Sequence, residues 1–194
     1  MRLTKIALAA SLIAGASFAI ASETKIGIQG GYASGGDTIA SITYTNGSSE
    51  TLKAGSGISI GAFTIVPLSD NDVALKLAAN YLNDSITASN GEVTFTRLPV
   101  DALVLKKLNK WQVAAGLTYH LNPQFKSTFD SGERVDADNA LGLLLEANYQ
   151  LYSKGEDSLA INIGARYTNI EYNFDGVTKN YDGSNLAITA GIIF

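Results

Sequence analysis

Residues 186–194, whose sequence is LAITAGIIF, carry the clearest structural signal in this chain. Apolar side chains occupy every second position there, and mostly small or polar residues lie between them: the apolar set is Leu186, Ile188, Ala190, Ile192 and Phe194. Successive side chains of a strand point to opposite faces, so a period of two indicates a strand with one apolar face. The C-terminal stretch therefore predicts an amphipathic β-strand, and the same pattern recurs along the chain.

The N-terminal residues have the composition of an export signal. Two basic residues precede an apolar run over 6–20, which closes on an A-x-A sequence at 19–21. A basic start, a short apolar core and small residues at the end are typical of a cleaved secretory signal peptide. We therefore expect residues 1–21 to be a signal peptide and residues 22–194 to form a single domain.

Composition narrows the class of protein further. The chain has 194 residues, a formal net charge of −4 and no cysteine. Disulfide, metal-thiolate and thiol chemistry are thereby excluded, the mild acidity does not favour a nucleic-acid partner, and we expect no cofactor. After residue 21 no run of about 18 apolar residues could span a bilayer as a helix. A membrane protein of this composition has to be a closed barrel, because only closure satisfies every backbone group in hydrocarbon.

Eight segments alternate with period two and are bounded by turn residues. The predicted strands cover residues 24–34, 53–67, 73–84, 95–107, 111–121, 140–152, 158–172 and 184–194. Short connections alternate with longer ones, which is typical of outer-membrane barrels with short periplasmic turns and longer extracellular loops. Asn46-Gly47 and Asn90-Gly91 predict tight type I′ turns in two of the long connections. The predicted fold is an all-β, eight-stranded antiparallel up-and-down transmembrane β-barrel.

Alternation also assigns side chains to lipid or lumen. A charged side chain facing lipid near the midplane costs roughly 2 to 4 kcal/mol, so the face that carries charges should be the lumen. Aromatic residues on the opposite, apolar face should then form two girdles. We predict an upper girdle of Tyr32, Tyr81, Tyr119 and Tyr167, and a lower girdle of Trp111, Tyr149 and Phe194.

Four lumen charges are expected to compensate one another. Lys76 and Asp101 lie on neighbouring strands at similar depth, and so do Glu146 and Arg166. Buried charges need partners. We therefore predict a structural ion-pair network that plugs the lumen, in preference to an ion pathway or a catalytic cluster.

With the signal sequence, eight alternating segments, short turns and terminal Phe194, the mature chain resembles the small bacterial outer-membrane barrels of the OmpX/Ail, OmpW and OmpA transmembrane-domain class. This resemblance implies export to the Gram-negative outer membrane. It also implies contact with outer-membrane lipid and lipopolysaccharide. In that class the terminal aromatic serves as the signal for the barrel-assembly machinery, and Phe194 matches it.

Function is predicted only by class. We expect a non-enzymatic barrel with a structural or adhesin-like surface-interaction role, because loops are where such scaffolds acquire function. The exposed ribbons around 38–44 and 93–96 offer edges for an extracellular protein partner by β-augmentation. Carboxylates in loop 122–139 match no calcium-loop spacing, so we expect a solvated mixed-charge loop rather than a metal site.

Three alternatives remain open from the sequence. An OmpW-like conduit for small hydrophobic molecules would use the inward Phe63, Leu103 and Leu144. A lipid A-modifying enzyme would use His120, although no Ser and carboxylate are spaced as a relay with it. A soluble lipocalin-like barrel would place the apolar residues inside instead of outside.

Overall fold

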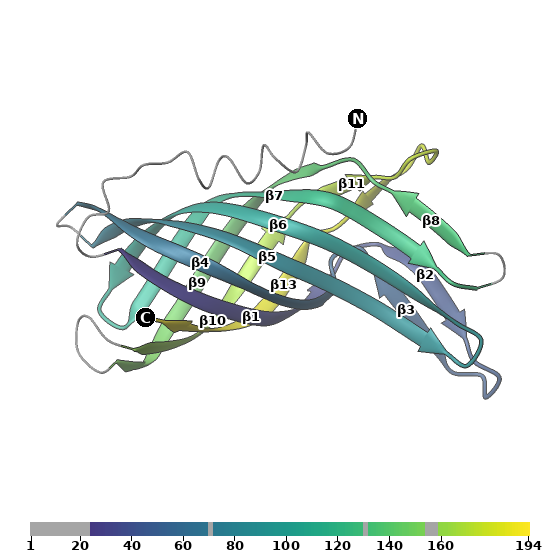
Figure 1. Cartoon of the computed structure of the whole chain (residues 1–194), viewed down its shortest axis with the longest axis horizontal. Helices are drawn as coiled ribbons and strands as arrows, with labels where there is room; N and C mark the ends of the chain where they lie inside the picture. Colours follow the sequence, from purple (N-terminus) through teal and green to yellow (C-terminus); the bar gives the residue numbers. More distant parts are fainter. Residues whose placement is uncertain (1–23, 70–71, 130–131, 154–158) are drawn as a thin grey trace.

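A computed structural model describes residues 24–69, 72–129, 132–153 and 159–194. Eight long antiparallel strands form a closed barrel, in which pairing of β6 with β7 completes the ring (Figure 1). The barrel strands are β1 (Lys25–Gly35), β4 (Gly57–Ser69), β5 (Val73–Ala88), β6 (Gly91–Leu108), β7 (Trp111–Ser127), β9 (Ala140–Ser153), β10 (Ala160–Asn169) and β13 (Asn185–Ile193). The predicted all-β, eight-stranded antiparallel barrel is confirmed. The predicted signal peptide lies outside the described residues.

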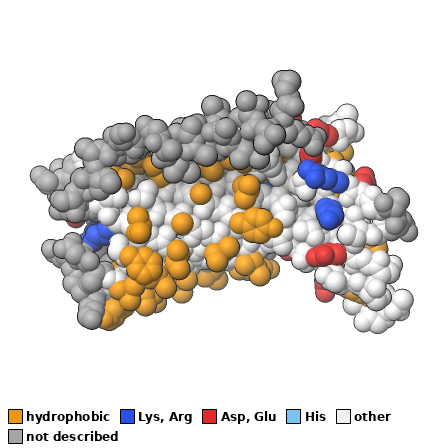
Figure 2. Space-filling model, viewed as in Figure 1, with side chains coloured by type: hydrophobic (Ala, Val, Ile, Leu, Met, Phe, Trp, Pro, Cys, Tyr) orange, Lys and Arg blue, Asp and Glu red, His pale blue; other side chains and the backbone are white. Residues whose placement is uncertain are grey.

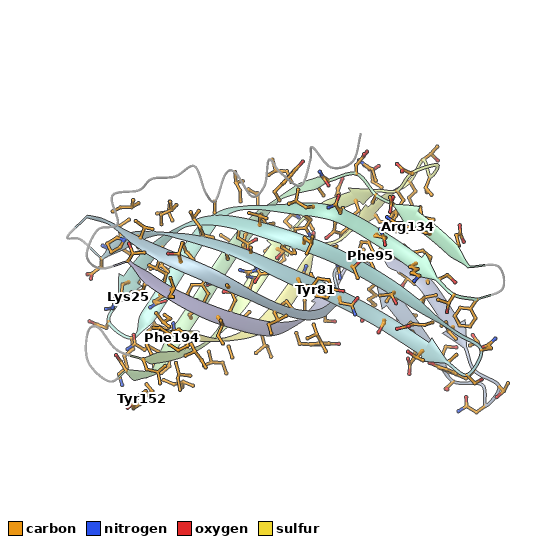
Figure 3. The ribbon with its side chains drawn as sticks, in the orientation of Figure 1. Lys25, Tyr81, Phe95, Arg134, Tyr152 and Phe194 are labelled. Carbon is orange, nitrogen blue, oxygen red and sulfur yellow. The ribbon has the colours of Figure 1, made fainter. Side chains whose placement is uncertain are left out.

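Each barrel strand pairs with the next barrel strand along the chain, and the first pairs with the last. Tyr32 of β1 lies opposite Ile188 of β13, and the backbone N–H of Phe194 donates to the carbonyl of Ile26 at 2.8 Å. Closure leaves no open edge in the wall, which satisfies the backbone groups that a half-open sheet would expose. The strands at the two ends of the described chain therefore form one seam, and Lys25 and Phe194 lie at the same end of the molecule (Figure 3).

Five shorter strands extend from the opposite end of the barrel. They are β2 (Thr38–Thr43), β3 (Ser49–Lys53), β8 (Glu133–Asp136), β11 (Glu171–Asn173) and β12 (Asn180–Asp182). β2 pairs with β3, β11 pairs with β12, and β8 continues the wall beside the end of β7. We call these strands, together with the tips of β5, β6 and β7, the extracellular lobe, following the predicted orientation.

Several predicted boundaries differ from the structure at this end. The predicted strand 53–67 is divided, because residue 53 ends β3 and β4 starts at Gly57, whose φ of 141° interrupts a regular strand. The predicted strand 158–172 is divided likewise: β10 stops at Asn169 and residues 171–173 pair with β12. The predicted loop 122–139 contains the end of β7 and β8. Alternation does not mark the first break, since apolar residues occupy even positions on both sides of it. At the second break the apolar positions change from odd, ending at Tyr167, to even, starting at Ile170.

Both type I′ turn predictions are wrong. A type I′ turn needs positive φ at two successive central residues. Gly47 alone has positive φ in the first turn, where its N–H donates to the carbonyl of Tyr44 and Thr45-Asn46 occupy the central positions. In the second hairpin Ala88 pairs with Gly91, so Ser89-Asn90 form the turn without any positive φ. The hairpins exist, but the pairing register of the first is shifted by one residue from the predicted register, and that of the second by two.

The outer surface of the barrel is apolar and the inside is polar. Exposed apolar side chains cover the wall, and Figure 2 shows them over the barrel, with charged side chains gathered toward the extracellular lobe. Inward positions of the same strands hold Lys76, Asn80, Asp101, Glu146 and Asn148, all buried. A lipocalin-like barrel would show the reverse arrangement, so that alternative is wrong. None of the described segments forms a helix that is long and apolar enough to cross a bilayer.

The aromatic residues predicted as girdles all lie on the outward-facing positions. Tyr32, Tyr81, Tyr119 and Tyr167 are each between 41% and 59% exposed, and Trp111 and Phe194 are 53% and 55% exposed. Trp111 and Tyr149 are direct cross-strand partners, with ring centroids 5.0 Å apart. Figure 3 shows Phe194 at one end of the barrel and Tyr81 farther along it, toward the lobe. This arrangement suits a barrel whose apolar band lies between two aromatic levels.

Candidate functional site

The four predicted lumen charges come together inside the barrel. They are supplied by β5, β6, β9 and β10, and alternation points each of them inward, because the outward neighbours on the same strands are apolar. Glu146 and Arg166 lie directly opposite each other on adjacent strands. Lys76, Asp101 and Glu146 are 4%, 1% and 5% exposed. The lumen therefore holds two cations and two anions away from bulk water.

The ion pairs cross the lumen as well as linking neighbours. Lys76 Nζ lies 2.5 Å from Glu146 Oε1, which comes from a strand well separated in the wall. Arg166 Nη2 lies 2.9 Å from Asp101 Oδ2 and 3.1 Å from Glu146 Oε2. The sequence predicts Lys76 beside Asp101, whereas the ion pair of Lys76 is formed with Glu146. Arg166 bridges both carboxylates and joins the four residues into one network.

Neutral side chains complete the hydrogen bonding of the carboxylates. Asn80 Nδ2 and Thr118 Oγ1 donate to the two oxygens of Asp101 at 3.0 and 2.6 Å. Asn148 Nδ2 donates to Glu146 Oε1 at 2.6 Å. Gln29 in turn donates to Asn80. A buried ion network is tolerated only when its remaining lone pairs and protons are satisfied, and these amide and hydroxyl groups supply that.

Apolar side chains occupy the lumen around the network. Leu103 and Leu144 are each 1% exposed and pack in one cluster, while Phe63 lies in a second cluster and its ring contacts the Lys76 ammonium at 4.7 Å from the centroid. A cavity of about 20 Å³ lies between Gln29, Phe63, Lys76, Gln112 and Asn162, among others. That volume suits about one water molecule. In the described residues we find side chains filling the lumen rather than a wide channel, as expected for eight strands.

A further buried charge, outside this network, closes the mouth of the barrel toward the lobe. Arg97 on β6 is 1% exposed, and its guanidinium donates to the carbonyls of Ala54 and Ser56, at 2.5 Å for Ser56. The same guanidinium lies 4.3 Å from the ring centroid of Phe95. Carbonyl dipoles and an aromatic face both favour a cation that has lost its water. Arg97 thereby ties the β3–β4 turn to the inside of the barrel.

His120 lies at this mouth, against the ring of Tyr172. Its side chain is 3% exposed, and Nδ1 lies 2.6 Å from the hydroxyl of Tyr172. The Tyr172 ring meets Phe95 edge-on, with centroids 5.4 Å apart. A nucleophile would need a base within hydrogen-bond reach, and the hydrogen-bond partner of His120 is a buried phenol. Its surroundings fit a packed mouth.

The lobe above the mouth has an apolar core of its own. The buried residues of this core, which we call the lobe core, come from β3 and the turn after it, from β5, β6 and β9, and from residues 170–174: Leu52, Ala54, Ile86, Val93, Phe95, Ala140, Ile170, Tyr172 and Phe174. Backbone bonds join the ribbons, since Asp138 donates to Asn173 and Asp175 to Asp136. These connecting segments are therefore packed structure. Among the described residues no group of three or more metal-ligating side chains is found, the 133–138 stretch included.

Sequence reasoning missed Arg97 and Tyr172. Arg97 has the same strand parity as Asp101, which follows it by four residues, so alternation alone could have assigned it to the lumen side. Its partners Ala54 and Ser56 come from a turn that carries no motif. Tyr172 likewise has the parity of Arg166, and every even position from 162 to 174 is buried or half-buried, so alternation through the predicted strand 158–172 could have placed its side chain inward as well.

The whole barrel resembles solved outer-membrane proteins. Neisserial surface protein A has 12% sequence identity and a TM-score of 0.51, with 89% of this chain and 96% of that chain covered. Ail of Yersinia pestis, solved in complex with the heparin analogue sucrose octasulfate, has 15% identity and a TM-score of 0.53, with coverage of 89% and 99%. OprG of Pseudomonas aeruginosa has 15% identity and a TM-score of 0.48, with coverage of 88% and 95%.

No protein-family model matches the chain, and no curated protein matches it. The structural likenesses establish the fold, which is that of the small eight-stranded outer-membrane barrels, as the sequence predicted.

Proposed function

We propose that this chain is an outer-membrane barrel with a plugged lumen whose function is carried by its extracellular lobe. The observation that carries the proposal is the combination of an apolar outer wall and a lumen filled by the Lys76, Asp101, Glu146 and Arg166 network. An apolar belt of this kind is stable in lipid and unstable in water. A filled lumen leaves the lobe as the part available to other molecules.

Two experiments test the membrane and plug parts of this proposal. The folded protein should be recovered in the outer-membrane fraction and should migrate differently on a gel before and after heating. In planar bilayers it should give no stable large-solute conductance, and a Glu146→Ala barrel should give none either. Large, long-lived conductance steps from the wild-type barrel would overturn the plug, and recovery in the soluble fraction would overturn the membrane assignment.

The lobe offers β2 as an edge for a protein partner. β2 pairs with β3 on one side only, and its alternate backbone groups point away from that partner. Residues Thr38, Ser41 and Thr43 are exposed along this strand. An extended segment of another protein could add to this edge by β-augmentation. The proposed role is accordingly an adhesin-like one and requires no enzymatic activity.

Charge indicates what kind of partner the lobe would accept. Carboxylates dominate the described lobe: Asp37, Glu50, Asp84, Glu92, Glu133, Asp136, Asp138, Glu171, Asp175 and Asp182. The basic residues there are fewer, and one of them, Arg97, is buried. Such a surface repels polyanions. We therefore expect no binding of a sulfated ligand like the one in the Ail complex, and a neutral or basic protein segment fits this surface better.

A single substitution tests the edge. Ser41→Pro removes a backbone donor from β2 and should abolish binding of whole cells to immobilised matrix or serum proteins, while Ser41→Ala should retain it. Deletion of residues 37–50 should have the same effect as the proline. Unchanged binding in both the proline variant and the deletion would overturn the role of β2.

One observation keeps a conduit for small hydrophobic molecules as a second candidate. Pro99 lies within β6, and the pairing of β5 with β6 passes from Ala79–Val100 to Leu82–Arg97 without a partner for the two intervening residues of β5. Proline cannot donate to the ladder, so the wall is weakest there. Native mass spectrometry of the extracted barrel tests this candidate. A reproducibly bound apolar molecule that is lost on Leu103→Asn would favour it, and a bare barrel would exclude it.

The remaining partners follow from the same proposal. Phe194 is exposed at the end of the last strand, where a terminal aromatic can be read by the barrel-assembly machinery. The outward tyrosines would contact outer-membrane lipid and lipopolysaccharide. Phe194→Ala should lower the amount of folded barrel in the membrane without changing the melting temperature of the fraction that does fold.

A further inference from the structure

Three lysines gather on the β6–β7 hairpin, at the end of the barrel away from the lobe. Lys106 and Lys107 lie near the end of β6, Lys110 lies in the turn, and all three are exposed. Asn109 has a φ of 56°, and the N–H of Lys107 donates to the carbonyl of Asp72 at 2.8 Å. A tight, bonded turn therefore fixes where the lysine backbones lie.

This hairpin has no carboxylate of its own. The chain contains no Asp or Glu between Asp101 and Asp130, so the lower part of β6 and the whole of β7 carry only positive charge. Asp72, in the neighbouring turn, is joined to the hairpin through its backbone carbonyl. The lobe at the other end is dominated by carboxylates. Among the residues that the structure describes, the two ends thus differ in the sign of their exposed charge.

Exposed apolar and aromatic side chains lie beside these lysines. Trp111 is 53% exposed and contacts Tyr149, while Leu108 and Tyr152 are each 48% exposed. Long basic side chains lie along apolar surface and keep their ammonium groups at the level of the headgroups. Tryptophan next to lysine at the edge of an apolar band is the arrangement found at a membrane interface.

We propose that the β6–β7 hairpin binds anionic phospholipid headgroups, of the phosphatidylglycerol type, in the inner leaflet of the membrane. This inference rests on the proposed placement of the barrel in the outer membrane. Lys107 and Lys110 attract the lipid phosphate over about a Debye length of 8 to 10 Å, and Trp111 and Leu108 contact its glycerol and acyl region. The apolar neighbours favour a lipid over a free anion.

Trp111 is the single tryptophan of the chain, so its fluorescence reports directly on the lipid at this hairpin. The folded barrel would be reconstituted in phosphatidylcholine vesicles that contain the same fraction of either brominated phosphatidylglycerol or brominated phosphatidylcholine. Bromine on the acyl chains quenches only nearby tryptophan, and lipid in both leaflets makes the result independent of barrel orientation. We expect an enrichment of phosphatidylglycerol at Trp111 of about fivefold at low salt, falling toward onefold at 0.5 M salt.

Matched variants identify the source of the enrichment. Lys107→Gln/Lys110→Gln should bring the enrichment close to onefold, whereas Lys126→Gln/Lys179→Gln, at the lobe end, should leave it unchanged. Equal quenching by both brominated lipids in the wild type would overturn the lipid preference while leaving the membrane placement intact. Enrichment that survives in the Lys107/Lys110 variant would also overturn the proposal. No quenching by either lipid would instead overturn the proposed placement of the barrel in a membrane.

Discussion

Glu146 is the residue that holds the lumen network together. Its carboxylate accepts from Lys76, Asn148 and Arg166, so it meets both cations of the network. Removing one partner of a buried pair leaves an uncompensated charge, which costs more than the pair itself contributes. The four charges therefore depend on one another. The stability of the lumen depends on equal numbers of cations and anions more than on how many charges it holds.

Neutralising Glu146 alone should destabilise the barrel. In Glu146→Gln two cations share the single carboxylate of Asp101, and we expect the free energy of unfolding to fall by roughly 3 to 5 kcal/mol. The loss would be measured by urea unfolding in lipid vesicles. Glu133→Gln changes an exposed carboxylate of β8 and should alter the stability by less than about 0.5 kcal/mol.

A double variant separates charge balance from packing. Lys76→Met/Glu146→Gln leaves one cation and one anion, which the structure already pairs at 2.9 Å in Arg166 and Asp101. We expect the double variant to be more stable than Glu146→Gln, because its lumen is neutral again. Equal stability of the single and double variants would mean that shape, and not charge, makes Glu146 necessary.

Arg97 should control how firmly the lobe is held to the barrel. Arg97→Met removes the bonds to the carbonyls of Ala54 and Ser56 while keeping much of the buried volume. Loss of charge-assisted bonds worth at least about 1.4 kcal/mol should speed local opening about tenfold. In limited proteolysis of the vesicle-bound barrel, the β2–β3 ribbon of this variant should then be cut faster than that of the wild type. Arg134→Met changes an exposed ion pair in β8, and the ribbon of that control should be cut at the wild-type rate.

Among the structural elements, the two ribbons β2–β3 and β11–β12 branch from a junction of closely packed glycines. The N–H of Gly55 donates to the carbonyl of Gly35 at 3.2 Å, and Asp37 donates to the carbonyl of Asp182. A Cβ at Gly36 would lie 2.6 Å from the Asp182 carbonyl oxygen, and one at Gly55 would lie 2.6 Å from that of Gly183. The β1–β2, β3–β4 and β12–β13 connections can therefore approach one another only without side chains.

Two glycines of similar backbone conformation test this junction. Gly36 has a φ of 80° and no room for a Cβ, whereas Gly47 has a φ of 84° with nothing within 4 Å. Gly47→Ala should cost about 1 to 2 kcal/mol from the left-handed backbone alone. Gly36→Ala should cost clearly more, because backbone atoms must also move. Thermal unfolding of both variants in the same detergent compares them, and equal melting temperatures would exclude a packed junction.

Taken as a complete molecule, the barrel is asymmetric from end to end. One end carries short turns, three lysines on one hairpin and Phe194, and the other carries the acidic lobe with its own apolar core. The long connections are structured by the lobe core and not by the bilayer. Orientation in the membrane therefore decides which of two chemically different surfaces meets the outside.

The absence of cysteine allows orientation to be tested on intact cells. Gly47→Cys, at the tip of the β2–β3 ribbon, should react with a membrane-impermeant maleimide, whereas Asn109→Cys, in the β6–β7 turn, should react only after the outer membrane is opened. Both positions have open turn geometry, so accessibility and not packing decides the result. Labelling of Asn109→Cys alone on intact cells would reverse the proposed orientation.

Period-two alternation along the chain is enough to specify the barrel. Strand count, the apolar wall and the inward assignment of Lys76, Asp101, Glu146 and Arg166 all follow from it, because the pleat fixes which face a side chain takes within one strand. Alternation is a local rule, so it holds as long as the strand is unbroken. It also assigned the outward tyrosines and Trp111 correctly to one face.

Which charges meet, and how the mouth is closed, depends instead on contacts between distant parts of the chain. Lys76 pairs across the lumen with Glu146, and Arg97 bonds a turn more than 40 positions earlier in the chain. Such partners depend on barrel closure and on the relative stagger of the strands, which no local period encodes. The lobe is the extreme case, because the inward parity changes after Lys53, between β3 and β4, and because its core forms from ribbons that meet only in space.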